Sequence, residues 1–287
     1  MRAITKPTYD TKLVYETAIN SIKSNELKTR LNSVVNFLVS AAIDYEKNAT
    51  GASLYNIQPD NQDDEEYVLI DVKKKELLDL YSQHMVGLNK PARKIYDELL
   101  GAATNGKCPS CGFGQASTLD HYLPKTKFPF FSMLPLNLVP ACKDCNTGKN
   151  AKFAVTGEQQ PIHPYYDHNG FVTEQWLFAE VEETSPISIR YYVKTPDTWG
   201  DISKERVRTH FNDFNLSKRF SVEAADELTS LISMLNDYSA DTSAEGVRNN
   251  LEREAMNEYK IHKNSWKTAM YQALATNDWF CLGGYNL

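Results

Sequence analysis

Hydrophobic side chains recur at helical spacing through the N-terminal third of the chain, from about Leu13 to Leu100. Apolar residues three and four positions apart share one face of a helix, and such a face is normally buried. The clearest stripe comprises Leu27, Leu31, Val34, Val35, Leu38, Ala41 and Ala42. We therefore predict that this region is helical and that its stripes pack in an ordinary core.

The same region contains the signals of two further helices and a strand. Apolar residues at 77–81 indicate one helix, and residues 89–91 (Asn-Lys-Pro) predict the cap of another, which Gly101 ends. A polar, acidic stretch at 58–66 precedes a predicted short strand at 67–72. We interpret the acidic run as a solvated loop, with a partner-binding surface as the alternative.

The C-terminal half combines a hairpin pattern with further helical stripes. Apolar and polar residues alternate strictly from Ile187 to Val193, which predicts a half-buried strand. Its expected partner is the segment 173–181. Helical periodicity returns after Trp199, in one stripe and then a longer one capped near Ser243: Leu228, Leu231, Ile232 and Leu235, followed by Val247, Leu251, Tyr259, Trp266, Met270 and Leu274.

Composition narrows the class of protein. The 287 residues are 41% hydrophobic, which is enough for one large domain or two small ones. The apolar run from Val34 to Ile43 is well short of the ~20 residues that cross a bilayer, and no basic-then-apolar leader opens the sequence. We expect a cytoplasmic protein that does not contact membranes.

Two cysteine pairs have the spacing of a metal site: Cys108 with Cys111, and Cys142 with Cys145. In a reducing compartment, such pairs are more often metal ligands than disulfides. Four thiolates favour tetrahedral zinc, and a closed four-sulfur site leaves no position for a reacting water. We therefore predict one structural Zn²⁺, and we expect Cys281 to be a partly buried free thiol.

The segment framed by these cysteines contains groups that a structural zinc does not need. Asp120 and His121 are adjacent, Asn137 follows in the same segment, and Asn146 comes directly after the last cysteine. Carboxylate, imidazole and amide oxygen are the groups that a hydrolytic centre with a hard metal ion uses. The sequence therefore predicts a second, catalytic site within the zinc frame.

The local pattern and charge of this segment fit such a site. It predicts strands at 118–122 and near 137–139, then a short helix that begins near 142–146. The whole chain has a net charge of −6, which argues against nonspecific nucleic-acid binding over its surface. Between 107 and 153, however, six lysines outnumber two acidic residues, and phosphate contact requires positive charge of this kind.

In this order, the Asp120-His121 pair, Asn137, the segment Cys142-Lys-Asp-Cys145-Asn146 and Lys149 resemble the HNH endonuclease family, also called the ββα-metal nucleases. The resemblance covers about residues 108–152. The last position of the family motif is often His, and Asn146 is similar to the H-N-N variants. The resemblance implies a small ββα-metal module at the centre of the chain.

The resemblance also implies a role for each of these residues. His121 is the implied general base, which suits an imidazole because its pKa lies near neutrality. Asp120 and Asn146 are the implied ligands of one catalytic Mg²⁺ or Mn²⁺, and Asn137 braces the loop that carries the base. Taken alone, His121 could be a structural histidine, Asn146 a helix cap and Asn137 a turn residue.

Three further residues are candidate phosphate contacts. Lys149 and Lys125 lie close to the motif, with solvated surface as the alternative for both. His163 lies in the stretch His-Pro-Tyr-Tyr-Asp at 163–167 and could reach the ion or the phosphate once the chain folds back. Its alternative is a packing or surface histidine.

The function implied is metal-dependent hydrolysis of nucleic-acid phosphodiester bonds, with DNA as the expected substrate and a 5′ phosphate and 3′ hydroxyl as products. A similarity to nuclease components of anti-phage systems such as Septu implies a defence role and an ATPase partner. Oligomerisation is a further expectation. The alternatives are a non-catalytic zinc-ribbon module that binds nucleic acid or a protein, and a degenerate nuclease kept as a scaffold.

The fold class we predict is α+β. A zinc-stapled module at 102–170 is expected between an N-terminal helical region, 1–101, and a C-terminal region of hairpin and helices, 171–287.

Overall fold

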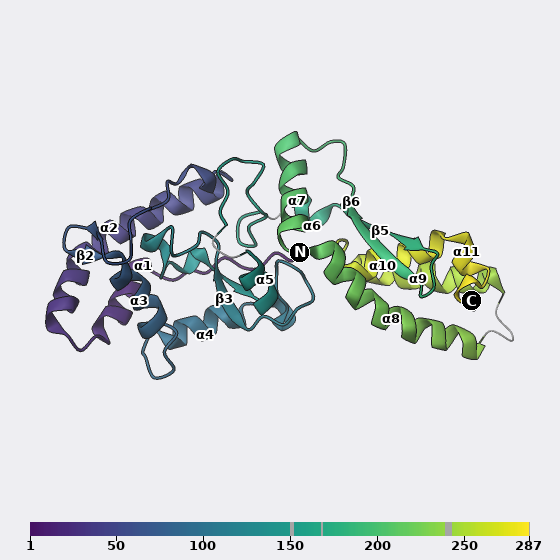
Figure 1. The fold of residues 1–287 in the computed structure, drawn as a ribbon, viewed down its shortest axis with the longest axis horizontal. Coiled ribbons are helices and arrows are strands. Elements are labelled where there is room, and N and C mark those ends of the chain that lie inside the picture. Colours follow the sequence, from purple (N-terminus) through teal and green to yellow (C-terminus); the bar gives the residue numbers. More distant parts are fainter. Residues whose placement is uncertain (150–151, 168, 239–242, 287) are drawn as a thin grey trace. The chain divides into compact units, whose positions relative to one another are not determined.

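The computed structural model describes residues 1–149, 152–167, 169–238 and 243–286 (Figure 1). The chain divides into two compact units. The N-terminal unit is Arg2–Asp167, and the C-terminal unit is His168–Leu287 together with Met1. Each unit combines helices with small two-stranded sheets, so the chain belongs to the α+β class. The boundary expected at residues 101 and 102 lies inside the N-terminal unit.

Four helices form the first part of the N-terminal unit: α1 Thr11–Asn20, α2 Asn25–Thr50, α3 Lys74–His84 and α4 Arg93–Gly101. The stripe predicted for α2 is confirmed, since Leu31, Val34, Val35, Leu38 and Ala42 are buried. Helix α1 packs against α2 and α3, and Ser24 caps α2 by accepting from the N–H of Leu27.

The start of α4 differs from the expectation. Its N-cap is Ala92 and not Asn89, because residues 90–93 form a turn in which the N–H of Arg93 bonds to the carbonyl of Lys90. The end of the helix at Gly101 is confirmed. Short 3₁₀ turns follow two of these helices, Leu54–Asn56 (η1) after α2 and Thr104–Gly106 (η2) after α4.

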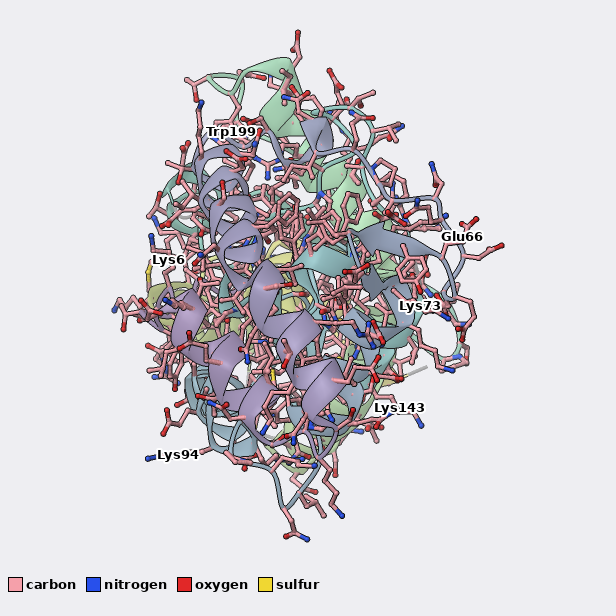
Figure 2. All side chains as sticks on the ribbon, turned by 90° about the vertical axis from the view of Figure 1, so that its left-hand side faces the viewer. Lys6, Glu66, Lys73, Lys94, Lys143 and Trp199 are labelled. Carbon is pink, nitrogen blue, oxygen red and sulfur yellow. The ribbon has the colours of Figure 1, made fainter. Side chains whose placement is uncertain are left out.

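The strand expected at 67–72 is a small hairpin instead. Strands β1, Tyr67–Leu69, and β2, Val72–Lys73, pair antiparallel, because the chain reverses at residues 70 and 71. The acidic loop before the hairpin is tied down by Lys74, whose buried ammonium group lies 3.1 Å from Asp60 Oδ1. Figure 2 shows Glu66 and Lys73 at this edge of the N-terminal unit.

The segment framed by the cysteines folds as two strands and a helix: β3 Thr118–His121, β4 Leu138–Ala141 and α5 Lys143–Lys149. Strands β3 and β4 pair antiparallel, with Asp120 opposite Val139 and His121 opposite Leu138. Two 3₁₀ turns, η3 Pro129–Phe131 and η4 Pro135–Asn137, lie in the connection between the strands. Because Asn137 belongs to η4, β4 begins one residue later than predicted and extends to Ala141.

The β3–β4 pair presents two different faces. Side chains alternate along a strand, so Leu119 and His121 share one face, and Thr118 and Asp120 share the other. Leu119 and Leu138 belong to the hydrophobic cluster that also contains residues of α1, α2, α3 and α4. Helix α5 packs against β3 (Figure 1). His121 therefore lies at the boundary between the small sheet and the helical layer.

The C-terminal unit contains one hairpin and six helices within its described residues. Strands β5, Leu177–Glu182, and β6, Ser188–Val193, pair along their whole length. Strand β5 begins four residues later than the predicted start at residue 173, because Asn169–Thr173 form the short helix α6. The remaining helices are α7 Asp201–Asp213, α8 Leu216–Tyr238, α9 Ala244–Ile261, α10 Trp266–Thr276 and α11 Asp278–Cys281, before a 3₁₀ turn (η5) at Gly284–Asn286.

The long C-terminal stripe belongs to two helices and not to one. Ser243 caps α9, as predicted, by accepting from the N–H of Gly246. The chain leaves the helix at His262, and Ser265 caps α10 through the N–H of Thr268. Helices α9 and α10 pack against each other, which buries Val247 and Leu251 of one half of the stripe and Met270 and Leu274 of the other. Of the helices in the described ranges, none is long and apolar enough to cross a membrane.

Candidate metal and catalytic site

The four cysteines of the predicted zinc site come together in the N-terminal unit. Their sulfur atoms all lie within 4.8 Å of one another, and all four side chains are buried. The sulfurs of Cys111 and Cys142 are 3.8 Å apart. Four sulfurs at ~2.3 Å from a tetrahedral zinc are about 3.8 Å from each other. The cluster therefore has the dimensions of a zinc site and could hold such an ion.

The first cysteine pair lies in a tight turn that depends on glycine. The N–H of Gly112 bonds to the carbonyl of Cys108 at 2.7 Å, and Gly112 adopts a positive φ of 80°. Gly114 is under a different restriction. A Cβ atom at this position would lie 2.9 Å from the sulfur of Cys142, so only glycine allows the two halves of the cluster to meet. Sequence reasoning missed Gly114, although its place three residues after Cys111 was a signal.

The second pair lies at the start of α5. Cys142 precedes the helix, Cys145 lies in its first turn, and the N–H of Asn146 bonds to the carbonyl of Cys142. The thiols act on one another strongly. A hydrogen bond from Cys108 lowers the pKa of Cys111 to about 6, while hydrogen bonds with Cys111 and Cys142 raise the pKa of Cys108. A dication would stabilise all four as thiolates.

His121 is buried at the end of β3 and is held by the backbone. Its Nε2 lies 2.9 Å from the carbonyl oxygen of Ser132, and its side chain is 8% exposed. Because a carbonyl oxygen only accepts, Nε2 must carry the hydrogen, and the neutral ring then has its lone pair on Nδ1. The local structure thus selects one tautomer of the imidazole.

Asn146 and Asp120 lie toward the opposite face of β3. The side-chain Nδ2 of Asn146 donates to the hydroxyl of Thr118 at 3.0 Å, which ties α5 to the face that Thr118 shares with Asp120. This use of Nδ2 leaves Oδ1 as the atom that suits a hard cation. The carboxylate of Asp120 and the amide oxygen of Asn146 therefore belong to neighbouring positions on one side of the strand.

Tyr81 of α3 packs against His121. Its ring packs edge to face on the His121 imidazole, with ring centroids 4.5 Å apart and an interplanar angle of 73°. Burial raises the pKa of Tyr81, and the nearby Tyr96 and Asp120 raise it further. Tyr81 thus contacts His121 directly, while the charge of Asp120 acts on it through space.

Asn137 is fully buried and makes hydrogen bonds to the loop after His121. Its Oδ1 accepts from the N–H of Leu123, and its Nδ2 donates to the carbonyls of Leu123 and Phe131. The carbonyl of Asn137 also accepts from the N–H of Tyr122, directly after His121. These bonds fix the path of the chain directly after His121.

Lys125 lies beside the same aromatic ring. Its ammonium nitrogen is 5.7 Å from the centroid of Tyr81 and 3.5 Å from the hydroxyl of Ser82. Burial lowers the pKa of Lys125, an effect that nearby Asp79 and Asp64 oppose. Lys149 ends α5, but its side chain lies outside the described residues.

His163 lies in a buried aromatic cluster and not beside His121. It is 1% exposed, it stacks on Tyr122 at 4.1 Å, and its Nε2 lies 3.2 Å from the hydroxyl of Tyr45. Its Nδ1 accepts from the N–H of Tyr165. Both ring nitrogens are thus engaged within the protein, and this geometry favours the packing role that sequence reasoning held as the alternative.

Two features outside this region do not extend the site. A cleft of about 350 Å³ lies in the C-terminal unit, between the turn that contains Pro186 and residues Ile232 and Tyr285. The described residues that line it offer hydroxyl and apolar groups but no acidic, basic or sulfur ligand. Cys281 is buried in the same unit, where it donates to the carbonyl of Leu274, and burial raises its pKa.

Two residues that contact His121, Tyr81 and Ser132, were not singled out from the sequence. Tyr81 was assigned only to a helical core stripe, and Ser132 had no motif around it. Their contact with His121 depends on α3 packing against the loop between β3 and β4, and no local spacing predicts that packing.

The chain is similar in sequence to a bacteriophage protein. It is 36% identical over 230 residues to protein Ea31 of Escherichia phage lambda, and the match covers 75% of this chain and 77% of the phage protein. No family model matches the chain, and no solved structure matches it. At this identity and coverage, the chain belongs to the family of the phage lambda protein Ea31.

Proposed function

We propose that the N-terminal unit is a metal-dependent endonuclease of the HNH, or ββα-metal, type. The order of β3, β4 and α5 is that of a ββα module, and the four cysteines bring the turn before β3 next to the start of α5. The residues that resemble the HNH motif lie on these elements: Asp120 and His121 on β3, Asn137 before β4, and Asn146 on α5. A structural zinc would occupy the four-cysteine cluster.

The observation that carries the proposal is the hydrogen bond between His121 Nε2 and the carbonyl of Ser132. It fixes the tautomer in which Nδ1 can accept a proton, as a general base must. A packing histidine such as His163 also has a selected tautomer, so the support comes from the groups that surround His121. Here the selected tautomer occurs next to Asp120, inside a metal-binding frame, and beside a loop braced by Asn137.

The proposed donor set fits a hard divalent cation. Asp120 and Asn146 would hold Mg²⁺ or Mn²⁺ through oxygen, and the hydrogen bond from Asn146 Nδ2 to Thr118 orients the amide for this purpose. When bound, such an ion would neutralise the negative charge on the scissile phosphate and on the departing oxygen.

The proposed reaction consumes one water molecule and one phosphodiester. His121 Nδ1 takes a proton from the water while the water oxygen bonds to phosphorus. The bond between phosphorus and the 3′ oxygen then breaks. The 3′ oxygen gains a proton from solvent, and His121 returns its proton to solvent. The products are a 5′ phosphate and a 3′ hydroxyl. Lys125, at the edge of the site, is the described lysine best placed to hold a phosphate.

We propose DNA as the substrate, while a defence role, an ATPase partner and oligomerisation stay predictions. A chain with a net charge of −6 does not attract nucleic acid over its whole surface, so delivery by a partner or a second copy is consistent with its composition. The related Ea31 is a phage protein, and its name describes no activity.

The decisive experiment measures nicking of supercoiled plasmid with Mg²⁺ or Mn²⁺ by the wild type, His121→Ala and Asn146→Ala. We expect cleavage that requires added divalent metal and falls at least ~100-fold in His121→Ala, the usual size of a general-base contribution. His84→Ala serves as the matched control, because His84 is a half-buried histidine whose Nδ1 bonds to the hydroxyl of Ser21 after α1. Equal zinc content in all four proteins excludes loss of the frame as the cause.

Two results would count against the proposal. Cleavage by His121→Ala at the wild-type rate would show that His121 is not the general base. Absence of cleavage of plasmid, single-stranded DNA and RNA, combined with binding of one of them, would favour the non-catalytic zinc module instead.

A further inference from the structure

Helix α3 lies outside the zinc-stapled segment, yet it reaches the proposed base along two routes. The first route passes through Ser132. The hydroxyl of Ser132 donates to the carbonyl of Leu77 at 3.0 Å, and the carbonyl of the same serine accepts from His121 Nε2 at 2.9 Å. Ser132 is 0% exposed, so no water competes for either bond. The position of α3 thereby sets the position of the oxygen that selects the tautomer.

The second route is direct and starts one helical turn later. Tyr81 follows Leu77 by four residues, so both lie on the same face of α3. The Tyr81 ring packs edge to face on the imidazole, and the ammonium group of Lys125 lies near the same ring. An edge-to-face contact restricts the plane of the smaller ring as well as its location. His121 is thus held at one nitrogen and along its ring.

Helix α3 is itself firmly anchored. Leu77 and Leu80 are buried in the main cluster of the N-terminal unit. Glu76 accepts two hydrogen bonds from the guanidinium of Arg30, at 2.7 and 2.8 Å, and the buried Lys74 bonds to the acidic loop. Such a helix can act as a fixed wall for an active site, because its own position is determined by contacts on several sides.

We propose that Tyr81 is a positioning residue for His121, and that α3, through Tyr81 and the Leu77–Ser132 hydrogen bond, holds the imidazole in its Nε2–H tautomer and in one ring plane. This inference rests on the proposed function for its catalytic meaning. The arrangement of His121 that it describes can be tested without any activity. The inference gives α3 a role in orienting the proposed base, in addition to its role in packing.

Charges around Tyr81 are compatible with this role. Burial raises the pKa of Tyr81, and neighbouring Tyr96 and Asp120 add to the rise, while Arg93 lowers it. The hydroxyl therefore stays protonated at neutral pH. Tyr81 then contributes an uncharged ring beside the imidazole.

The test compares the full-length wild type with Tyr81→Phe, Tyr81→Leu and Ser132→Ala. Tyr81→Phe keeps the ring, Tyr81→Leu removes it, and Ser132→Ala cuts the bond to Leu77 while leaving the carbonyl in place. Val35→Ala in α2 is the matched control for loss of stability, because Val35 belongs to the same hydrophobic cluster. All five proteins are first compared for zinc content and melting temperature.

The first readout is the tautomer of His121, measured by long-range proton–nitrogen correlation on ¹⁵N-labelled protein and assigned with His121→Gln. We expect the pure Nε2–H form in the wild type, Tyr81→Phe and Val35→Ala. Tyr81→Leu and Ser132→Ala should give a mixture of tautomers. An unchanged Nε2–H form in Tyr81→Leu would overturn the inference, whether or not the protein cleaves nucleic acid.

The second readout is cleavage kinetics. We expect kcat of Tyr81→Leu to fall ~10- to 100-fold with KM within about twofold, since misplacing a reacting group by about 1 Å can cost ~100-fold. Tyr81→Phe should stay within ~3-fold of the wild type, as rescue by the retained ring requires. An equal loss in Tyr81→Leu and Val35→Ala would reduce the effect to stability and contradict the positioning role. A wild type without activity but with the expected tautomers would leave the inference standing and reject the nuclease.

Discussion

The side chain of Asn137 binds both backbone polar groups of Leu123. Its Oδ1 accepts from the Leu123 N–H at 2.7 Å, and its Nδ2 donates to the Leu123 carbonyl at 3.0 Å. A second bond from Nδ2 reaches the carbonyl of Phe131, and Asn137 is 0% exposed. One amide therefore substitutes for backbone pairing in the loop that follows His121. This loop has no regular structure that could satisfy these groups otherwise.

Replacement of Asn137 by alanine should destabilise the N-terminal unit. The change leaves the N–H and carbonyl of Leu123 buried without a partner, so we expect the free energy of unfolding to fall by about 2–4 kcal/mol. Urea denaturation measures the effect. Asn146→Ala is the matched control, expected to change stability by less than ~1 kcal/mol because its amide is only partly buried. Equal stabilities of the two variants would contradict the bracing role.

Removal of a zinc ligand should unfold the central segment. We expect one zinc per chain in the wild type, and less than ~0.2 per chain in Cys108→Ser, by elemental analysis. Because structural zinc supplies folding free energy outright, the melting temperature should fall by ~10 °C or more. Cys281→Ser should keep its zinc, since Cys281 lies in the other unit. Full zinc in Cys108→Ser would show that the cluster is not the binding site.

Acid should weaken the anchoring of α3 through Glu76. Burial alone would raise the pKa of Glu76, but hydrogen bonds from Arg30 and from the backbone of Lys73 outweigh it, and the pKa is lowered. The unfolded chain therefore binds this proton more readily. The resulting stability is present above the unfolded-state pKa of about 4.3 and is lost as the pH falls through the folded-state pKa.

The measurement compares wild type and Glu76→Gln by urea denaturation at several pH values. We expect the wild type to be more stable at pH 7 by roughly 1–2 kcal/mol, as for a bidentate, partly buried pair, and the difference to shrink steadily below about pH 4. Glu46→Gln breaks the exposed pair with Lys6 and should have almost no effect at any pH. A difference that stays constant down to the acid limit would contradict the assignment.

Replacement of His163 should separate packing from phosphate binding. Its ring is 1% exposed and bonded through both nitrogens, so His163→Asn should lower the free energy of unfolding by about 2–3 kcal/mol. KM for the nucleic acid should stay within about twofold. Lys125→Ala, in contrast, should raise KM with little loss of stability. A raised KM in His163→Asn at unchanged stability would show that His163 contacts the phosphate and is not only a packing residue.

Local pattern was sufficient where the chemistry is local. The cysteine pairs and their spacing predicted a metal cluster, and the four sulfurs do meet. The α2 stripe and the Ser243 cap were also predicted, because a helix face and a capping hydroxyl need only neighbours within one or two turns. The chemistry of Asp120, His121 and Asn146 could be proposed from order alone.

Local pattern failed where the chain reverses without a strong turn signal. Residues 67–72 read as one strand, but the chain turns at residues 70 and 71, where the carbonyl of Asp71 accepts from Arg30. The long C-terminal stripe read as continuous, because the apolar period resumes after the break at His262–Ser265. In both places a distant or later partner decides the backbone path.

The sequence by itself determined which groups could act: four thiols at zinc spacing, and an imidazole between a carboxylate and an amide. Only the tertiary structure decided how the imidazole is held. Its tautomer depends on the carbonyl of Ser132, and its ring plane on Tyr81, a residue 40 positions earlier in the chain. The reason is physical, since orientation in a buried site is set by whatever packs against it, and packing brings together segments whose sequences carry no mark of each other.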